Sequence, residues 1–280
     1  TALHAALLSL GIGSGDLVVT TPFSFIATSN SVLYVGAKPV FIDINEDSFN
    51  IDLDKFEEYI QKKKSAVKAV IIVHLYGNPV DMFRVIKICR KYGIKVIEDC
   101  AQSHGASVKG KLTGSFGITG CFSFYATKNM TTGEGGMVVT DDKKLNDSLR
   151  KIINHGRKSR FEHDTLGYNF RMTNLQAGIG LVQLDKLEKM TELRIKNAEY
   201  LSAKLKKISW IQVPCPTNKD SKHVYHQYTI RVPEKVRDRL VEFLIKNNID
   251  ASMIYPLTIP EQPLYKKLGY STKDLSVSMK

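Results

Sequence analysis

Two kinds of apolar pattern alternate along the first two thirds of the chain. Amphipathic spacing, which is typical of helices, alternates with short apolar runs, which are typical of strands. The helical pattern covers 2–10, 23–34, 53–63 and 81–92, and the strand pattern covers 17–20, 39–43, 66–74 and 95–99. Because the strand segments are continuously apolar, we expect strands that are buried on both faces. The pattern therefore predicts a three-layer α/β/α fold around a mostly parallel sheet.

The last third of the chain has a different pattern. Apolar residues at helical spacing, without an internal breaker, predict one long helix over 181–207. Beyond it we expect a strand over 225–232, a helix over 233–246 and a short strand over 251–254. Strands and helices in this order are typical of a smaller α+β unit.

The domain division follows from this change of pattern. We predict a large domain over 1–185, followed by a connecting helix and a partial small domain over 186–280. The chain starts at Thr1 inside a helical pattern and stops at Lys280 without a closing element. We therefore expect a sequence that is truncated at both ends, so that any targeting segment would lie outside it.

The 280 residues carry a formal net charge of +12, which raises the question of nucleic-acid binding. The lysines are scattered along helical segments instead of being interleaved with aromatic residues in one patch, which argues against a nucleic-acid partner. A basic surface suits an anionic small substrate equally well. No stretch reaches the roughly 18 to 20 apolar residues of a membrane helix, so we predict no membrane partner.

The four cysteines are Cys89, Cys100, Cys121 and Cys215. They form no Cys-x-x-Cys pair and have no histidine at metal-binding spacing, so we predict no metal site. Free thiols are typical of a reducing compartment, which indicates a cytoplasmic location.

Lys128 lies between an apolar run that includes Ser123 and a glycine-rich turn that ends at Gly136. A lysine held at a strand end away from water can have its ammonium form disfavoured, which leaves a nucleophilic amine. Such an amine can form an imine with an aldehyde cofactor. On this stretch alone the alternative, a solvated lysine at the edge of a hairpin, stays open.

A carboxylate ends the strand pattern over 95–99. Ligands of an open α/β sheet bind outside the carboxyl ends of its strands, so Asp99 is well placed to meet one. Gln102 could hydrogen-bond to the ligand beside it. The alternative is that Asp99 only caps the segment that follows. His104 is a further candidate for catalysis, although a histidine packed in a loop is the commoner case.

Several positions suit the parts of a planar ligand that carries a phosphate. Thr1 and Ala2 open a helix, and free amides at the amino end of a helix bind phosphate. The Ser123 hydroxyl could meet a phosphate oxygen, although many strand serines bond only to backbone. Phe25 could stack on a ring, although such an aromatic residue more often belongs to the core.

Three segments together carry a family resemblance that no single position provides. They are Glu98-Asp-Cys-Ala-Gln-Ser-His-Gly105, the segment from Gly117 to Gly136, and Gly167-Tyr-Asn-Phe-Arg-Met172. In the last of these, Asn169 and Arg171 could reach an anion. The chain resembles the DegT/DnrJ/EryC1/StrS family of pyridoxal-phosphate-dependent sugar aminotransferases, which have the aspartate-aminotransferase fold (fold type I). The resemblance covers essentially the whole chain.

The resemblance implies a role for each candidate position. Lys128 matches the lysine that binds the cofactor covalently, and Asp99 matches the aspartate that keeps the ring nitrogen protonated. The other matches are Gln102 near the ring's phenolic oxygen, Phe25 stacked on the ring, Thr1, Ala2 and Ser123 at the phosphate, and Asn169 at the phosphate of the neighbouring subunit. The resemblance therefore also implies a homodimer with shared active sites.

The reaction implied by the resemblance is transamination of a nucleotide-linked keto sugar, with glutamate as the amino donor. Such reactions belong to amino-sugar, cell-surface polysaccharide or secondary-metabolite biosynthesis. Two alternatives are a sugar dehydratase of the same family, which has histidine in place of the lysine, and a non-catalytic cofactor-binding regulator. The presence of Lys128 and Asp99 argues against both alternatives. The sequence does not indicate which sugar, nucleotide or sugar carbon (C3 or C4) is involved.

Overall fold

The structure is a computed structural model that describes residues 1–63 and 66–280. At its centre lies a six-stranded sheet with the strand order β2-β1-β3-β4-β7-β8. Its strands are β1 (Leu17–Thr20), β2 (Lys38–Phe41), β3 (Val67–Val73), β4 (Lys95–Asp99), β7 (Thr119–Ser123) and β8 (Gly136–Val139). All neighbouring strands pair in parallel except β8, which runs antiparallel to β7. The prediction of a mostly parallel sheet is confirmed.

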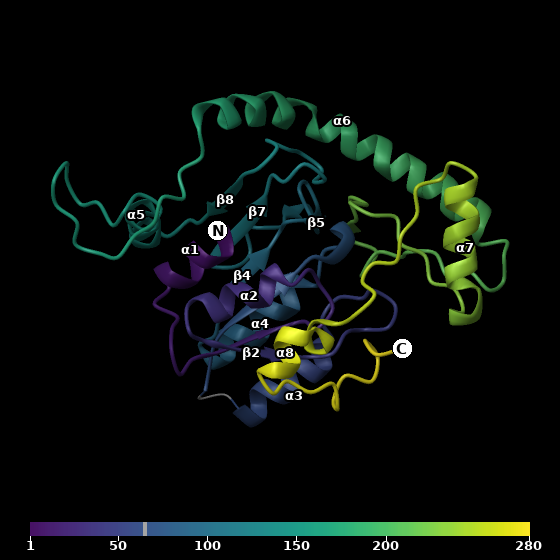
Figure 1. Cartoon of the computed structure of the whole chain (residues 1–280), viewed down its shortest axis with the longest axis horizontal. Helices are drawn as coiled ribbons and strands as arrows, with labels where there is room; N and C mark the ends of the chain where they lie inside the picture. Colours follow the sequence, from purple (N-terminus) through teal and green to yellow (C-terminus); the bar gives the residue numbers. More distant parts are fainter. Residues whose placement is uncertain (64–65) are drawn as a thin grey trace.

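Helices cover both faces of this sheet (Figure 1). They are α1 (Ala2–Ser9), α2 (Ala27–Tyr34), α3 (Leu53–Lys63), α4 (Met82–Tyr92) and α5 (Lys143–Ile152). Strand β3 shows how the layers form, because its successive side chains enter different cores. Ala69 and Ile71 pack with residues of α1 and α5, whereas Val70 and Ile72 pack with residues of α3 and α4. The predicted three-layer fold is therefore confirmed.

The connection between β7 and β8 is closed by backbone hydrogen bonds because β8 reverses direction. The Phe124 N–H donates to the Gly135 carbonyl at 2.9 Å, and the Thr132 N–H donates to the Phe124 carbonyl at 2.9 Å. Gly133 turns the chain with φ +78°, a value that side chains with a Cβ rarely adopt. Lys128 lies within this closed connection.

The remaining elements lie around the carboxyl edge of the sheet and beyond it. They are η1 (Leu75–Gly77), β5 (Ser107–Val108), β6 (Lys111–Leu112), α6 (Asn174–Leu205), β9 (Ser221–Lys222), α7 (Glu234–Lys246), η2 (Ile259–Glu261) and α8 (Pro263–Lys267). Strands β6, β5 and β9 form a small antiparallel sheet. Helix α6 runs along the top of the molecule as seen in Figure 1. No helix of the described ranges is long and apolar enough to cross a membrane.

Two helices begin at positions that differ from the prediction. Helix α2 starts at Ala27, because the Phe23 N–H donates to the Thr21 hydroxyl in a preceding turn. Helix α6 starts earlier than predicted, at a capping box in which Thr173 and Gln176 exchange side-chain and backbone hydrogen bonds. The other predicted helices and the four strands predicted within residues 17–99 agree with the structure to within two residues.

The predicted strands over 225–232 and 251–254 are wrong. The first segment pairs with the loop that follows β3, where the Gln227 N–H donates to the Tyr76 carbonyl at 3.4 Å. Near its end a single bridge joins Arg231 to Gln212. The second segment is also held by a loop, since the Tyr76 hydroxyl donates to the Ile254 carbonyl. Tertiary contacts thus replace the strand pairing that local apolar pattern suggested. The division of domains at residue 185 stays a prediction.

Candidate active site

The carboxyl ends of β4 and β7 bring the main candidate residues to one edge of the sheet. Asp99 is the last residue of β4 and pairs in register with Cys121 on β7, and Ser123 ends β7. Lys128 lies in the connection that follows β7. The structure therefore brings Asp99, Ser123 and Lys128 to the edge where ligands of parallel sheets bind.

Asp99 is buried and its carboxylate is oriented by two donors. The Thr28 hydroxyl donates to one oxygen at 2.8 Å, and the Ala101 N–H donates to the other at 3.1 Å. A carboxylate oxygen can accept more than one hydrogen bond, so two donors leave accepting capacity for a ligand. Thr28 belongs to α2, which explains why no signal near Asp99 in the sequence pointed to it.

Lys128 is half-buried, and its environment changes the chemistry of its amine. Burial lowers the pKa of the Lys128 amine, while the negative charge of Asp99 opposes this shift. A larger fraction of the Lys128 amine is consequently neutral near neutral pH than in a solvated lysine. This is the nucleophilic form that reacts with carbonyl groups.

His104 is buried close to Lys128. Its ring lies 5.4 Å from the Phe122 ring and 5.9 Å from the Phe124 ring, measured between centroids. Within the described ranges neither ring nitrogen has a hydrogen-bond partner. Burial lowers the pKa of His104 to about 4 although the nearby Ser123 backbone opposes the shift, and the charge of Lys128 adds a smaller lowering, so the ring is neutral at neutral pH. This environment favours a packed histidine over a general base that changes its charge near neutral pH.

Gln102 is also buried and makes two contacts. Its Oε1 accepts from the Tyr76 N–H at 2.6 Å, and its Nε2 donates to the Tyr255 hydroxyl at 3.3 Å. Tyr255 belongs to the irregular segment after α7, far from Gln102 in sequence. Sequence reasoning missed both tyrosines because only the folded chain brings them to Gln102.

The candidate phosphate donors lie near this edge. Ser123 pairs in register with Gly136, and a Cβ atom built on Gly136 would lie 3.6 Å from the Ala2 Cβ. The amino end of α1, which Thr1 precedes, therefore lies beside the residue of β8 that pairs with Ser123. The Thr1 side chain makes no capping hydrogen bond to its own helix. Free amides and a hydroxyl are the groups that bind a phosphate.

Phe25 is 61% exposed, which is unusual for a large apolar ring. It precedes α2, the helix that supplies Thr28 to Asp99. Its backbone lies beside the Tyr255 hydroxyl. The exposed ring is thus available to stack on a planar ligand near Asp99. Together with the lysine, the carboxylate and the phosphate donors, it makes a set that fits pyridoxal phosphate.

Asn169 and Arg171 lie outside this group. The backbone of Asn169 bridges to Asn154, and an Arg171 nitrogen donates to the Asn154 side chain at 2.8 Å. Both residues belong to the segment between α5 and α6, and Tyr168 and Phe170 on either side of Asn169 pack against the core cluster that contains α1. Among the hydrogen bonds of the described residues, none joins Asn169 to Ser123 or Lys128.

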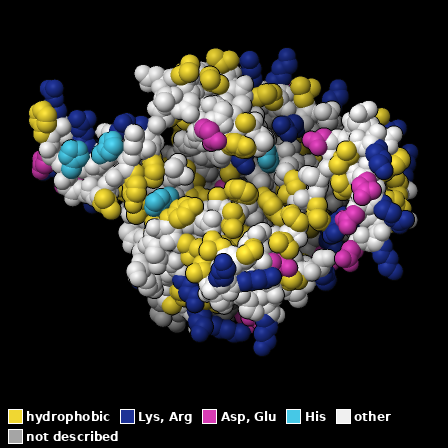
Figure 2. Space-filling view, viewed as in Figure 1, with side chains coloured by type: hydrophobic (Ala, Val, Ile, Leu, Met, Phe, Trp, Pro, Cys, Tyr) yellow, Lys and Arg dark blue, Asp and Glu magenta, His cyan; other side chains and the backbone are white. Residues whose placement is uncertain are grey.

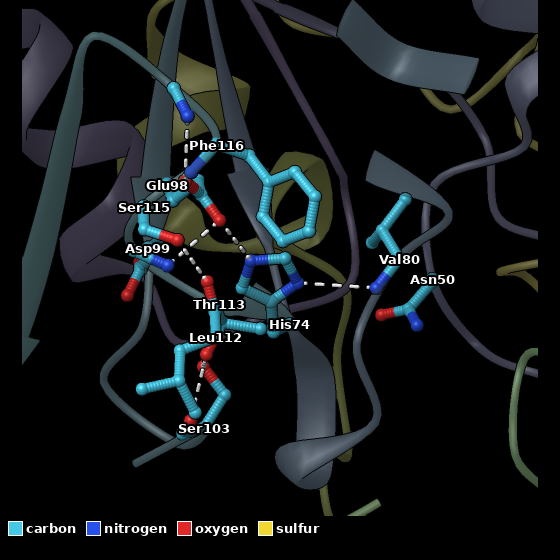
Figure 3. Close-up of polar contacts among 12 residues, drawn as sticks. Asn50, His74, Val80, Glu98, Asp99, Ser103, Leu112, Thr113, Ser115 and Phe116 are labelled. Atoms are coloured by element: carbon cyan, nitrogen blue, oxygen red, sulfur yellow. Dashed lines mark hydrogen bonds and ion pairs between the residues drawn. The ribbon is translucent and has the colours of Figure 1, made fainter. Parts of the chain in front are cut away.

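Next to Asp99, the side chain of Glu98 ties β4 to the loop before β7 (Figure 3). One oxygen accepts from the N–H groups of Phe116 and Gly117, both at 2.7 Å. The other accepts from the Gly114 N–H at 2.8 Å. Burial raises the pKa of Glu98, but hydrogen bonds from His74 and from this loop outweigh it and lower the pKa overall.

His74 completes the buried pair and its tautomer is defined. Its Nδ1 accepts from the Val80 N–H at 3.1 Å, so the ring proton lies on Nε2, which donates to Glu98 at 3.1 Å (Figure 3). Sequence reasoning missed this pair. A charged residue inside an otherwise apolar strand pattern was the available signal for Glu98.

A second histidine missed by sequence reasoning is His226. Its Nδ1 pairs with the side-chain oxygen of Asn129, the residue after Lys128, at 2.9 Å. Burial is the main cause that lowers the pKa of His226 to about 3, so this ring is neutral as well. The backbone carbonyl of His226 accepts from Arg194 of α6. The segment after β9 and helix α6 thus support the connection that carries the lysine.

Comparison with known proteins identifies the family of the chain. The model of the DegT/DnrJ/EryC1/StrS aminotransferase family matches residues 1–280. The chain belongs to the DegT/DnrJ/EryC1/StrS aminotransferase family. The resemblance read from the sequence is confirmed, and so is the prediction of an aminotransferase that uses pyridoxal phosphate, the cofactor of this family.

Two relatives and one solved structure illustrate the similarity within the DegT/DnrJ/EryC1/StrS family. A pleiotropic regulatory protein of Geobacillus stearothermophilus is 42% identical, over 98% of this chain and 73% of its own length. The UDP-N-acetyl-3-dehydro-alpha-D-glucosamine 3-aminotransferase of Acidithiobacillus ferrooxidans is 40% identical, over 94% of this chain and 70% of its own length. The structure of DesV from S. venezuelae, in complex with a ketimine intermediate, superposes with a TM-score of 0.94. It is 32% identical and covers 99% of this chain and 74% of its own.

Proposed function

We propose that the protein transfers an amino group from glutamate to a nucleotide-linked keto sugar, with pyridoxal phosphate bound covalently to Lys128. The observation that carries the proposal is the half-buried Lys128 amine, whose pKa burial lowers, at the sheet edge that Asp99 shares. A neutral amine attacks the aldehyde carbon of the cofactor. The Acidithiobacillus relative, named for the amination of a UDP-linked keto sugar, supports this substrate class.

Each part of the cofactor would contact different residues at this edge of the sheet. Asp99, held by Thr28 and Ala101, would pair with the protonated ring nitrogen, and Phe25 would cover one face of the ring. Thr1, Ala2 and Ser123 would bind the phosphate, and Gln102 would lie near the ring oxygen. When bound, the cofactor withdraws electrons from the carbon that carries the amino group. Once the amino donor has displaced it from the cofactor, Lys128 Nζ would accept the proton from that carbon and deliver it to the former aldehyde carbon of the cofactor.

The proposal is tested with the purified protein and its cofactor. Loading with pyridoxal phosphate should give the visible absorbance of a covalent imine, and reduction with borohydride should fix the label on the peptide that contains Lys128. Label on another lysine, or no label, would contradict the assignment. A panel of nucleotide-linked keto sugars with glutamate, scored by product mass, would then identify the substrate.

We also propose a homodimer in which Asn169 reaches the cofactor of the partner subunit. Asn169 is exposed in the segment between α5 and α6, and this segment and the start of α6 expose large apolar side chains. They include Phe161 at 85%, Leu166 at 80% and Leu175 at 78%. Figure 2 shows further apolar side chains on the surface of the side of the molecule that faces the viewer in Figure 1. Apolar surface of this kind marks protein–protein contacts.

Shared sites can be tested by mixing two inactive variants. Lys128→Ala removes the lysine of a site and Asn169→Ala removes the contact from the other subunit. Subunit exchange should place both changes in one site and leave the other site intact, which restores about a quarter of the wild-type activity. Failure to recover activity, with exchange verified by mass, would contradict the shared site.

A cytoplasmic location is the remaining part of the proposal. All four cysteines are free thiols, and Cys215 is exposed to solvent. An exposed thiol persists in a reducing compartment. Thiol labelling in intact and in lysed cells, compared with a cytoplasmic marker, tests this location.

A further inference from the structure

Two residues hold the Gln102 amide and determine its orientation. The Tyr76 N–H can only donate, so the amide atom that it meets at 2.6 Å must be the oxygen. The NH2 group consequently faces Tyr255, whose hydroxyl accepts one of its hydrogens at 3.3 Å. The backbone of Tyr76 thus settles a choice that an isolated amide leaves open.

Tyr255 is itself held in place by the segment around it. The Tyr76 hydroxyl donates to the Ile254 carbonyl at 2.8 Å, and the Tyr255 ring packs edge-on against Phe23 at 5.7 Å. Farther along, the Ile259 N–H donates to the Pro22 carbonyl at 2.8 Å. The loop before α2 and the loop after β3 therefore fix the position of the Tyr255 hydroxyl.

The amide of Gln102 has one N–H left. An amide NH2 group carries two hydrogens, and the hydrogen bonds of the described residues use only one of them. Gln102 follows Asp99 in the turn after β4, so both side chains lie at the edge where the cofactor ring would bind. A free N–H at this position has the polarity that an anionic ring oxygen requires.

We propose that Tyr255 is a positioning residue, which together with the Tyr76 backbone directs the remaining N–H of Gln102 to the ring oxygen of the bound cofactor. The inference rests on the proposed function, because it requires pyridoxal phosphate on Lys128. A hydrogen bond donated to this oxygen stabilises its anionic form. It therefore lowers the pH at which the ring oxygen and the Lys128 nitrogen lose the proton that they share.

The test is a titration of the visible absorbance of the cofactor-loaded protein against pH. Gln102→Leu removes the donor and should raise the midpoint by about 0.5 to 1 pH unit. Tyr255→Phe should raise it by a smaller amount, because the donor remains but is less well oriented. The double variant should have the midpoint of Gln102→Leu alone, since Tyr255 acts only through Gln102.

Two further variants keep the test decisive. Gln102→Glu retains the acceptor for the Tyr76 N–H and the shape of the side chain, but it cannot donate when ionised, so its midpoint should also rise. Tyr228→Phe removes a hydroxyl that pairs with Ser202 at 2.9 Å and should leave the midpoint unchanged.

Borohydride mapping of each protein distinguishes failure of the proposed function from failure of the positioning role of Tyr255 alone. Absence of label on Lys128 in the wild type would contradict the proposed function itself. Label on Lys128 with an unshifted midpoint in Tyr255→Phe would contradict the positioning role alone. So would a double variant whose midpoint rises beyond that of Gln102→Leu.

Discussion

Glu98 and Asp99 are neighbouring carboxylates at the end of β4, but their surroundings differ. Glu98 accepts four hydrogen bonds, from His74 and from three backbone N–H groups of one loop. Within the part of the chain that the structure describes, Asp99 accepts two, from Thr28 and Ala101. Successive side chains of a strand point to opposite faces, so the two carboxylates enter different environments. The protein satisfies the first carboxylate itself and leaves the second with capacity for a ligand, which separates a structural from a functional role.

The largest expected effect lies on the functional side of this comparison. Lys128→Ala should lower turnover by at least about 10³-fold, because the proton-carrying amine is lost. The free energy of unfolding should change little, since the amine forms no ion pair within the described ranges. Steady-state kinetics and urea unfolding measure the two quantities. Lys128→Arg is the matched control, and activity in that always-charged variant would contradict the role of a neutral amine.

Asp99→Asn should lower turnover by about 10²- to 10³-fold, because the amide cannot keep the ring nitrogen protonated. The variant should still carry the cofactor on Lys128, since the shape of the side chain and the Thr28 contact can persist. Absorbance of the bound cofactor and kinetics with glutamate test both statements. Normal turnover in this variant would rule out the role given to Asp99.

Glu98→Gln should lower the stability of the protein and leave turnover unchanged, whereas Asp99→Asn should lower turnover. A glutamine has one accepting oxygen, so its NH2 group would face backbone donors in the buried loop, at a cost of about 2 to 3 kcal/mol. The urea midpoint should fall, whereas turnover per folded, loaded molecule should stay near the wild-type value. Loss of turnover at unchanged stability would mean that the division between the two carboxylates is wrong.

The smallest expected effect is on the acid stability of the protein. The pKa of Glu98 is lower in the folded chain than the ordinary value of 4.5, mainly through hydrogen bonds that outweigh burial. Its contribution to stability is therefore complete above pH 4.5 and is lost as the pH falls through the lower folded-state pKa. Unfolding of wild type and Glu98→Gln between pH 3 and about pH 6 tests this, and the variant should have the weaker pH dependence. Equal slopes would contradict it.

Local patterns were sufficient for the sheet and for the residues at its edge. The runs that became β3 and β4 are continuously apolar, and Asp99 follows directly from the end of one of them. Lys128 was identified by its place between an apolar run and glycines. These features depend on neighbours in sequence, which is why they could be predicted.

Other features depend on segments that meet only in the folded chain. His74 and Tyr76 lie after β3, whereas Tyr255 and His226 come from the last third of the chain. The segments over 225–232 and 251–254 have strand-like composition, but loops of the sheet edge satisfy their backbone groups instead. Neither pairing partner nor side-chain contact is encoded in local periodicity, so these predictions failed.

The reversal of β8 has a consequence for the dynamics of the lysine segment. A parallel strand in its place would have required a long crossover, with Lys128 on a connection free to open at its ends. Here strand pairing and the hydrogen bonds of Phe124 close the segment at its base. Its base can then open only together with β7 and β8. Amide hydrogen exchange at Phe124 and Thr132 should therefore be as slow as in the central strands. The closed base would keep the reactive amine in position beside Asp99 between turnovers.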